Sequence, residues 1–232
     1  MLRGIRAVYF DAVGTLIHPA PPAAQVYAEV GRRFGSVLSP KVIGERFRAG
    51  WAREEAFDLS HNCRTSEERE LGRWRRIVAA VLDDVNDRDA CFEALYQHFG
   101  RPDSWSCDPG TASMLECLHG RSYLLGIASN YDRRLRTVAA GKPELRYLTS
   151  LVISAEVGWR KPAPQFFAAL GRTAEVSAET ILYVGDDPVN DYFPAESAGL
   201  QALLLDRDNR WLGKVPRRIA SLGAITSRPQ SA

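Results

Sequence analysis

Five short apolar runs, rich in valine, isoleucine, leucine and tyrosine, constrain the fold of this chain more than any other feature. They span residues 5–13, 121–128, 149–154, 180–185 and 200–205. Runs of this length and composition are typical of strands buried on both faces of a parallel sheet. Helical patterns separate the later runs, at 108–120, 161–171 and 188–199. Strand followed by helix, repeated, predicts an α/β fold with a doubly wound parallel sheet.

Prolines and glycines mark the expected ends of these helices. The pattern at 161–171 starts with Pro162 and ends with Gly171, and the pattern at 108–120 ends with Gly120. Proline is favoured in the first helical turn and glycine just after the last one. We therefore expect the helices to begin and end near these residues.

The stretch from about residue 19 to residue 106 breaks the alternation of strand and helix. It carries several helical patterns and no convincing strand, and it is far longer than a usual crossover of about 10–15 residues. One helical pattern opens with Thr65 and Glu68 at the spacing of a capping box. Four apolar residues then fall on one face of that helix: Leu71, Trp74, Val78 and Leu82. We expect a core formed by residues 1–18 and 106–232, interrupted by a helical domain at 19–105.

Composition excludes several classes of protein. The 232 residues are 45% hydrophobic and 25% charged with a net charge of +2, which is ordinary for a globular enzyme and gives no nucleic-acid footprint. No apolar run reaches the length of a membrane span and no signal-like segment precedes the first strand, so we expect a cytoplasmic protein. The four cysteines lack zinc-site spacing and are expected to be reduced core thiols. The final segment, 227–232, is expected to be a loose tail.

Polar side chains follow four of the predicted strands, at the edge where such folds bind ligands. In chain order they are Asp11, then Ser129 and Asn130, then Lys161, and finally Asp186, Asp187 and Asp191. Local structure alone could explain several of them. Asp11 could be a turn residue, Ser129 or Asn130 could cap a helix, and Asp187 before Pro188 is a good N-cap.

Local structure does not explain why the whole set is ordered along one edge. The acids near residue 186 would repel Asp11 if they met without a cation. Mg²⁺ resolves that conflict, because it is a hard cation that takes a few carboxylates, a carbonyl, water and substrate phosphate oxygens. The sequence therefore predicts a magnesium site at this edge.

These segments carry a resemblance to the haloacid dehalogenase superfamily of hydrolases. The chain is similar in four ordered motifs: "DAVGT", "SN", the lysine of "RKPAPQFF", and "GDDPVND". The resemblance implies a Rossmann-like core with a helical cap at the insertion. More narrowly, "SNYDRRL" and "AEVGWRKPAPQFF" resemble the group of haloacid dehalogenase-like hydrolase domain-containing protein 3, which also lacks the usual second aspartate of the first motif.

The resemblance implies phosphoryl transfer to an aspartate. Asp11 would attack phosphorus and form an aspartyl phosphate that water then hydrolyses. Ser129 would bind a phosphoryl oxygen, Asn130 would shape the pocket, and Lys161 would neutralise charge. Thr15 would orient the nucleophile. The implied Mg²⁺ ligands are Asp11, the Val13 backbone carbonyl, Asp186, Asp187 and Asp191. The expected substrate is a small phosphorylated metabolite.

Val13 departs from the pattern of the phosphatases in this superfamily. They carry at that position an aspartate that protonates the leaving group, and losing such an acid typically costs about 10²–10⁴ in rate. A metal-independent 2-haloacid dehalogenase needs no such acid, so this alternative stays open, as does a weakly active binding or regulatory module. The fourth motif favours the phosphohydrolase, because dehalogenases resemble the chain less there and have serine and asparagine where it has acids.

The helical insertion is expected to recognise the substrate. Five of its residues could reach an anionic group: Arg48, Trp51, Arg53, His61 and Arg64. Core packing for the tryptophan, and solvent exposure for the arginines, are the alternative explanations.

Overall fold

The computed structural model describes residues 2–226 and contains a six-stranded parallel sheet in the order β5-β4-β1-β6-β7-β8. The strands are β1 (Ala7–Phe10), β4 (Leu124–Ser129), β5 (Ser150–Ile153), β6 (Ile181–Gly185), β7 (Gln201–Leu205) and β8 (Arg218–Ile219). In β1, Ala7 lies opposite Leu124 of β4 on one side and Ile181 of β6 on the other. The first strand of the chain is therefore central, with both neighbours parallel to it. This confirms the predicted α/β fold.

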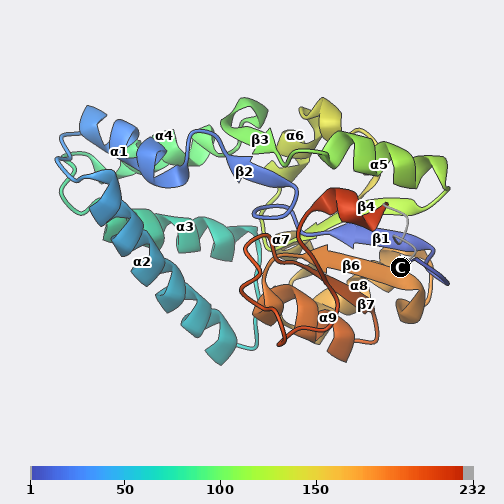
Figure 1. Ribbon diagram of the computed structural model, residues 1–232. Helices are drawn as coiled ribbons and strands as arrows, with labels where there is room; N and C mark the ends of the chain where they lie inside the picture. Colours follow the sequence, from blue (N-terminus) through green and yellow to red (C-terminus); the bar gives the residue numbers. More distant parts are fainter. Residues whose placement is uncertain (1, 227–232) are drawn as a thin grey trace.

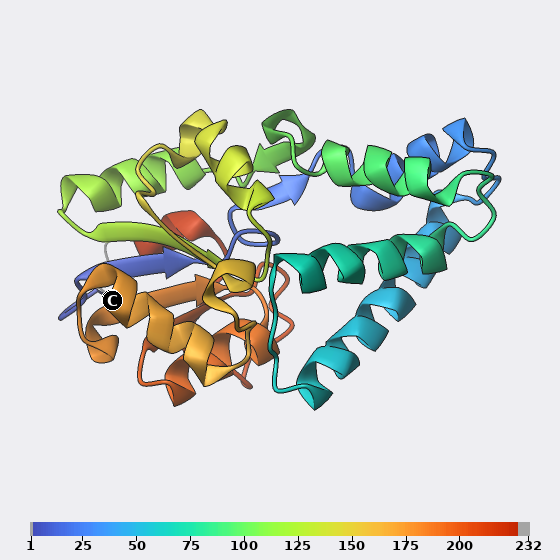
Figure 2. The ribbon, with the colours of Figure 1, turned by 180° about the vertical axis from the view of Figure 1, so that it is seen from behind.

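Helices cover both faces of the sheet (Figure 1; Figure 2). Alternate residues of β1 explain why, because Val8 and Phe10 pack into one apolar cluster while Ala7 and Tyr9 pack into another. The first cluster includes residues of α5 (Thr111–Gly120) and α6 (Arg134–Ala140). The second includes residues of α8 (Pro164–Ala174) and α9 (Phe193–Ser197). A strand buried on both faces needs both layers.

Four further helices form the insertion, which we call the cap, at one end of the sheet (Figure 1). They are α1 (Ala23–Arg33), α2 (Pro40–Ser60), α3 (Glu67–Val81) and α4 (Arg88–His98), and they enclose an apolar cluster of their own. Two short strands, β2 (Ile17–Pro19) and β3 (Trp105–Cys107), pair antiparallel where the chain leaves the core and returns. The proposed domain boundaries, at residues 18/19 and 105/106, fall within this pair.

Short helical turns complete the description. They are α7 (Ser154–Val157), the π-helical turn Pro188–Tyr192, and the 3₁₀ turns Pro102–Ser104, Pro143–Leu145, Ala178–Thr180 and Leu222–Ile225. Within residues 2–226, no helix is both long and apolar enough to cross a membrane. All four cysteines are free; Cys63 and Cys91 are buried, whereas Cys107 and Cys117 are only half-buried. The predicted tail, 227–232, lies outside the described residues.

Several predicted element ends were wrong. Helix α8 begins at Pro164 and not at Pro162, and it continues past Gly171 to a left-handed Glu175. Gly120 is the last residue of α5, whose C-cap is Arg121. These glycines are tolerated inside the helix because packing outweighs their low propensity.

The start of α3 also differs from the prediction. Its N-cap is Ser66, whose hydroxyl accepts the Arg69 amide, and the Thr65 hydroxyl instead donates to Glu70 at 2.6 Å. The expected capping box of Thr65 and Glu68 is therefore absent. Of the four residues expected on one face of this helix, Val78 and Leu82 are buried, and Leu71 and Trp74 pack half-buried against the same cluster.

Candidate active site

A lysine ammonium lies between two buried aspartates at the carboxyl edge of the sheet. The Nζ atom of Lys161 donates to Asp11 Oδ1 at 2.7 Å and to Asp191 Oδ1 at 2.6 Å. Asp11 directly follows β1, and Asp191 lies in the turn after β6. Asp186 joins them, so that one carboxylate oxygen from each of the three aspartates lies within 4.8 Å of the others. We call Asp11, Asp186 and Asp191 the acid cluster.

The acid cluster is short of positive charge. Burial raises the pKa of Asp191 to about 6, and neither Lys161 nor its other partners cancel that effect. Burial also raises the pKa of Asp11, with Lys161 opposing and Asp186 adding to the rise. The pKa of Asp186 is raised by burial and by the charge of Asp191. One lysine therefore does not neutralise three carboxylates, and a divalent cation bound among them would.

Ser129 and Asn130, at the end of β4, position Asp11 and Lys161. The Ser129 hydroxyl donates to Asp11 Oδ1 at 2.8 Å. The Asn130 amide makes two bonds to the backbone of Lys161, accepting its N–H at 2.7 Å and donating to its carbonyl at 3.1 Å. The expected group of Asp11, Ser129, Asn130 and Lys161 is thus brought together by the structure. Asn130 acts on the backbone that carries the lysine.

The hydrogen bond of the Thr15 hydroxyl goes to Asp186 and not to Asp11, the nucleophile that Thr15 was expected to orient. Its hydroxyl donates to Asp186 Oδ1 at 3.0 Å, so it orients the acid from the fourth motif. Gly14, just before it, has φ of +96°, and a Cβ there would lie 2.5 Å from Asp186 Oδ2. Glycine is therefore required for this close approach of the two loops.

Asp187 lies outside the acid cluster. It is the N-cap of the turn at Pro188–Tyr192, where its Oδ1 accepts the Val189 amide at 2.7 Å and its Oδ2 accepts the Asn190 side chain at 2.9 Å. These bonds occupy both carboxylate oxygens, as the local explanation anticipated. The structure thus groups Asp186 and Asp191 with Asp11, and gives Asp187 a capping contact.

Two residues near the site were missed by sequence reasoning. The Tyr183 hydroxyl in β6 accepts from Lys161 Nζ at 2.9 Å and donates to the Ala128 carbonyl at 2.8 Å. A tyrosine in a strand buried on both faces needs such a partner, which was a usable signal. Arg207, after β7, donates to the carbonyls of Gly14 and Thr15 at 2.7 and 3.1 Å. It holds the loop that follows Asp11.

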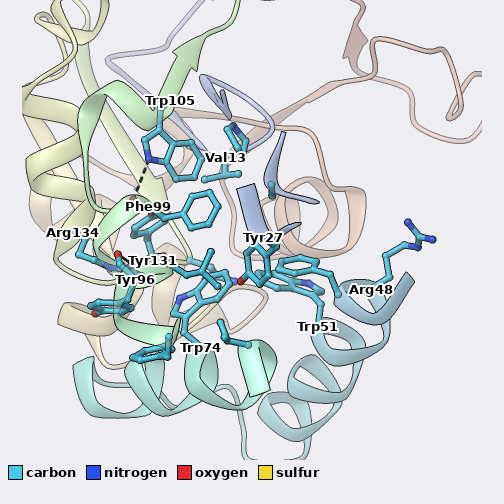
Figure 3. A pocket seen from close by; sticks show the side chains of 17 residues that line it. Val13, Tyr27, Arg48, Trp51, Trp74, Tyr96, Phe99, Trp105, Tyr131 and Arg134 are labelled. Atoms are coloured by element: carbon cyan, nitrogen blue, oxygen red, sulfur yellow. Dashed lines mark hydrogen bonds between the residues drawn. The ribbon is translucent and has the colours of Figure 1, made fainter. Parts of the chain in front are cut away.

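A cavity of about 420 Å³ lies between the cap and the core (Figure 3). Val13, whose side chain points into it, is 38% exposed, and Asn130 also lines it. Of the five cap residues expected to reach the substrate, only Trp51 and Arg48 line the cavity. Arg53 and Arg64 are exposed elsewhere, and His61 stacks on the exposed Phe57 ring at 3.9 Å.

A second group of charges, most of them buried, joins the cap to the core. It comprises Glu54 and Asp58 of α2, Arg69, Glu70, Arg73 and Arg76 of α3, and Arg160 of the core, and we call it the cap ion cluster. Arg160 contacts Glu70 closely and lies 3.3 Å from Asp58 Oδ2. Its neighbour in the chain is Lys161. Nearby backbone bonds from Arg160 to Cys63, at 2.8 Å, and from Thr65 to Gly158, at 3.1 Å, strengthen the junction.

Comparison with known proteins places this architecture. The model of the family "haloacid dehalogenase-like hydrolase" matches residues 5–199. Haloacid dehalogenase-like hydrolase domain-containing protein 3 of Homo sapiens is 27% identical over 210 residues, which are 87% of this chain and 82% of the relative.

Solved structures of enzymes with two different activities resemble this chain to a similar degree. A HAD phosphatase from Thermococcus onnurineus has a TM-score of 0.69 at 23% identity, covering 95% of this chain and 96% of its own. A 2-haloacid dehalogenase from Pseudomonas syringae has a TM-score of 0.66 at 23% identity, with the same coverage. The fold is common to both, so the substrate must be argued from the site. From the family match, this chain is a hydrolase and belongs to the haloacid dehalogenase-like hydrolases.

Proposed function

We propose that the chain is a Mg²⁺-dependent phosphohydrolase that acts on a small phosphorylated metabolite through an aspartyl phosphate. One observation carries the proposal: the three carboxylates of the acid cluster lie together with one lysine, Lys161, which pairs with only two of them, Asp11 and Asp191. Leaving such a surplus of negative charge buried is unfavourable unless a cation is bound. Mg²⁺ would be held by Asp11, Asp186 and Asp191 with the Val13 carbonyl, and it would offset negative charge on the phosphoryl group.

Asp11 has one oxygen free to react. Its Oδ1 accepts from Ser129 and Lys161, whereas its Oδ2 accepts no hydrogen bond from the described residues. Attack by Asp11 on phosphorus forms the acyl phosphate bond as the bond to the leaving oxygen breaks, and water later cleaves the acyl phosphate. Lys161 lies where charge develops, and Ser129 can turn its hydroxyl from Asp11 to a phosphoryl oxygen.

A metal-independent 2-haloacid dehalogenase is the second candidate, favoured by Val13. Halide leaves as an anion, so that reaction needs no general acid at this position. The acid cluster argues against it, because attack on carbon requires no cation and gains nothing from three crowded carboxylates. The third candidate, a binding module with residual chemistry, does not account for the retained contacts of Asp11, Ser129 and Lys161.

Two assays separate the candidates. We expect Mg²⁺ to raise the Tm of the purified protein and to be required for phosphate release from 4-nitrophenyl phosphate. Halide release from 2-chloropropionate in the presence of EDTA, with no phosphate release, would establish the dehalogenase. Release of neither phosphate nor halide would favour the binding module.

Matched variants test the ligand set. Asp186→Asn is expected to abolish the Mg²⁺-induced rise in Tm. Asp187→Ala is expected to keep that rise while costing about 1 kcal/mol of stability, because it removes an N-cap. If Asp187→Ala instead loses the Mg²⁺-induced rise in Tm and keeps its stability without metal, Asp187 belongs to the metal site.

A further inference from the structure

We infer that the substrate's leaving group is an apolar aromatic alcohol, a phenol or naphthol-like ring, that binds in the cavity between cap and core. This inference rests on the proposed function, since it names the ester that a phosphohydrolase at Asp11 would cleave. It begins from the composition of the cavity wall. Nine of the 17 lining residues are aromatic, drawn from all four cap helices, the segment that returns to the core, and the loop after β4.

The guanidinium and amide groups on the wall offer the cavity little. Arg134 donates from Nε and Nη2 to the two carboxylate oxygens of Asp132, at 2.8 and 2.7 Å, and from Nη1 to the Tyr96 carbonyl at 2.7 Å. Asn130 is occupied by the backbone of Lys161. Arg48 is exposed, and its guanidinium points away from the cavity (Figure 3). The wall therefore offers little to the several hydroxyls of a sugar, which would lose their bonds to water on entry.

The cavity continues from the site of chemistry. Val13 lies two residues after Asp11, and Asn130 lies between Ser129 and the backbone of Lys161 to which it bonds. A phosphoryl group at Asp11 would thus have its ester substituent directed along Val13 into the cavity. At about 420 Å³ the cavity is in the range of small-molecule pockets, roughly 300–1,000 Å³, and is large enough for one or two fused rings.

The wall is suited to a flat ring. The rings of Phe47 and Trp51 stack at 6.1 Å, and Trp51 and Trp74 lie 5.8 Å apart. Arg73 of the cap ion cluster lies 4.6 Å from the Trp51 ring and backs it from outside the cavity. Tyr27 adds a hydroxyl to the wall: the residue is 2% exposed, and its hydroxyl makes no hydrogen bond to another of residues 2–226. A ring with a single polar substituent would satisfy it.

An aryl ester also suits the absence of an acid at Val13. When Asp11 attacks, the bond from phosphorus to the aryl oxygen breaks and the phenolate leaves with the electron pair, then takes a proton from water. Water next adds to phosphorus and releases the Asp11 carboxylate and inorganic phosphate. A phenolate is stable enough to leave unprotonated, whereas an alkoxide is not.

Tryptophan fluorescence can report binding without turnover, because three of the five tryptophans of the chain line the cavity. The probe is 1-naphthylmethylphosphonate, which cannot be hydrolysed, compared with methylphosphonate. We expect quenching and at least tenfold tighter binding for the naphthyl compound. We also expect kcat/KM for 2-naphthyl phosphate to exceed that for glucose 6-phosphate by about 100-fold or more.

A substitution that fills the cavity tests the site, and the same substitution outside the cavity is its control. Ala23, half-buried in the first turn of α1, lines the cavity, whereas Ala49 of α2 is exposed and does not. Ala23→Phe should weaken naphthylmethylphosphonate binding about tenfold, and Ala49→Phe should leave it unchanged. Thermal melts of both variants check folding. If Ala23→Phe is unfolded, Ala23→Leu replaces it with a smaller addition.

The outcomes separate this inference from the proposed function. Naphthyl binding that Ala23→Phe weakens, without phosphate release from any ester, supports the aromatic site and overturns the phosphohydrolase. Mg²⁺-dependent hydrolysis of glucose 6-phosphate as fast as that of 2-naphthyl phosphate, with no quenching, overturns the aromatic site and leaves the phosphohydrolase. Equal binding of the two phosphonates overturns the aromatic site as well.

Discussion

Arg160 and Lys161 are neighbours in the chain and enter two charge clusters that differ in their balance of positive and negative groups. In the cap ion cluster, four guanidinium groups meet three carboxylates. The acid cluster has three carboxylates and one ammonium group, which pairs with only two of them, Asp11 and Asp191. The pKa shifts follow the balance. Burial alone would raise the pKa of Glu70, but Arg160 and Thr65 bring it below its usual value, whereas the pKa of Asp11 stays raised.

The difference separates a structural cluster from a functional one. A balanced group of charges in a protein interior stabilises its own ionised forms and can hold two units of structure together. An unbalanced group remains costly until a ligand completes it. The same residue types thus form a junction at Arg160 and, at Lys161, the site that we propose binds the cation.

The largest expected effect is on turnover when the acid cluster loses its nucleophile. Asp11→Asn should lower kcat by about 10⁴-fold or more, because the amide cannot form the acyl phosphate. The fold should survive, since the change removes a charge from an overcharged group. Steady-state kinetics and circular dichroism check both points. Substantial activity in a homogeneous Asp11→Asn sample would place the chemistry on another residue.

The cap ion cluster should instead respond in stability. Asp58→Asn removes the buried carboxylate that Arg69, Arg73 and Arg160 share and should cost about 3–5 kcal/mol, which corresponds to a Tm roughly 10 °C lower. Asp83→Asn removes an exposed carboxylate paired with Arg46 and serves as the control, with little expected change. Equal Tm values for the two variants would show that the cap ion cluster does not hold the junction.

The pH dependence of stability should differ between the clusters. The pKa of Asp191 is about 6 in the folded protein and near 3.9 when unfolded. As pH falls, the folded state therefore takes up a proton at a higher pH than the unfolded state does. Without metal, the free energy of unfolding should rise by on the order of 1–3 kcal/mol between pH 7 and pH 5. Below about pH 4.5 the lowered pKa values of Glu54 and Glu70 reverse the trend, because protonation removes their pairing.

Thermal melts in EDTA across this pH range test the prediction. We expect a maximum of Tm near pH 5, and saturating Mg²⁺ should move it upwards because the cation favours ionised carboxylates. A Tm that falls steadily from pH 7 to pH 5 in EDTA would mean that the acid cluster is not overcharged.

The smallest expected effect comes from adding a fourth carboxylate beside the acid cluster. Val13→Asp should raise kcat/KM for alkyl phosphates by about tenfold, short of the full ~10²–10⁴ of a positioned acid, because the apolar cavity does not orient it. Aryl phosphates should gain much less, since phenolate leaves without a proton. Mg²⁺ affinity is measured in parallel. Equal gains on both ester types would show that another group already supplies the proton.

The parts of the fold predicted from sequence are those that local patterns determine. The apolar runs predicted the central strands. From the sequence alone, the order of these strands predicted that Asp11, Ser129, Lys161 and Asp186 lie at one edge of the sheet. The strand β8, with two residues, carries too little pattern to be detected.

Long-range side-chain geometry could not be predicted. Glu70 and Arg160 meet across 90 positions of sequence, and each alone is consistent with a solvated surface charge. Thr15 was expected at Asp11, four residues earlier in the chain, but the loop turns at Gly14 and the Thr15 hydroxyl donates to Asp186. The cavity depends on how α1 to α4 pack, which no single periodicity describes.

The placement of Arg160 bears on how this enzyme can be recombined with its relatives. Exchange of a substrate-recognising module is usually planned at the two chain crossings, here the paired strands β2 and β3. A chimaera cut only there would carry away Asp58 and Glu70 and leave Arg160 behind as an unneutralised guanidinium, one residue from Lys161. A transferable module must therefore include a third, non-contiguous piece, the Gly158 to Arg160 segment. Modularity in this chain is set by charge partnership as much as by chain connectivity.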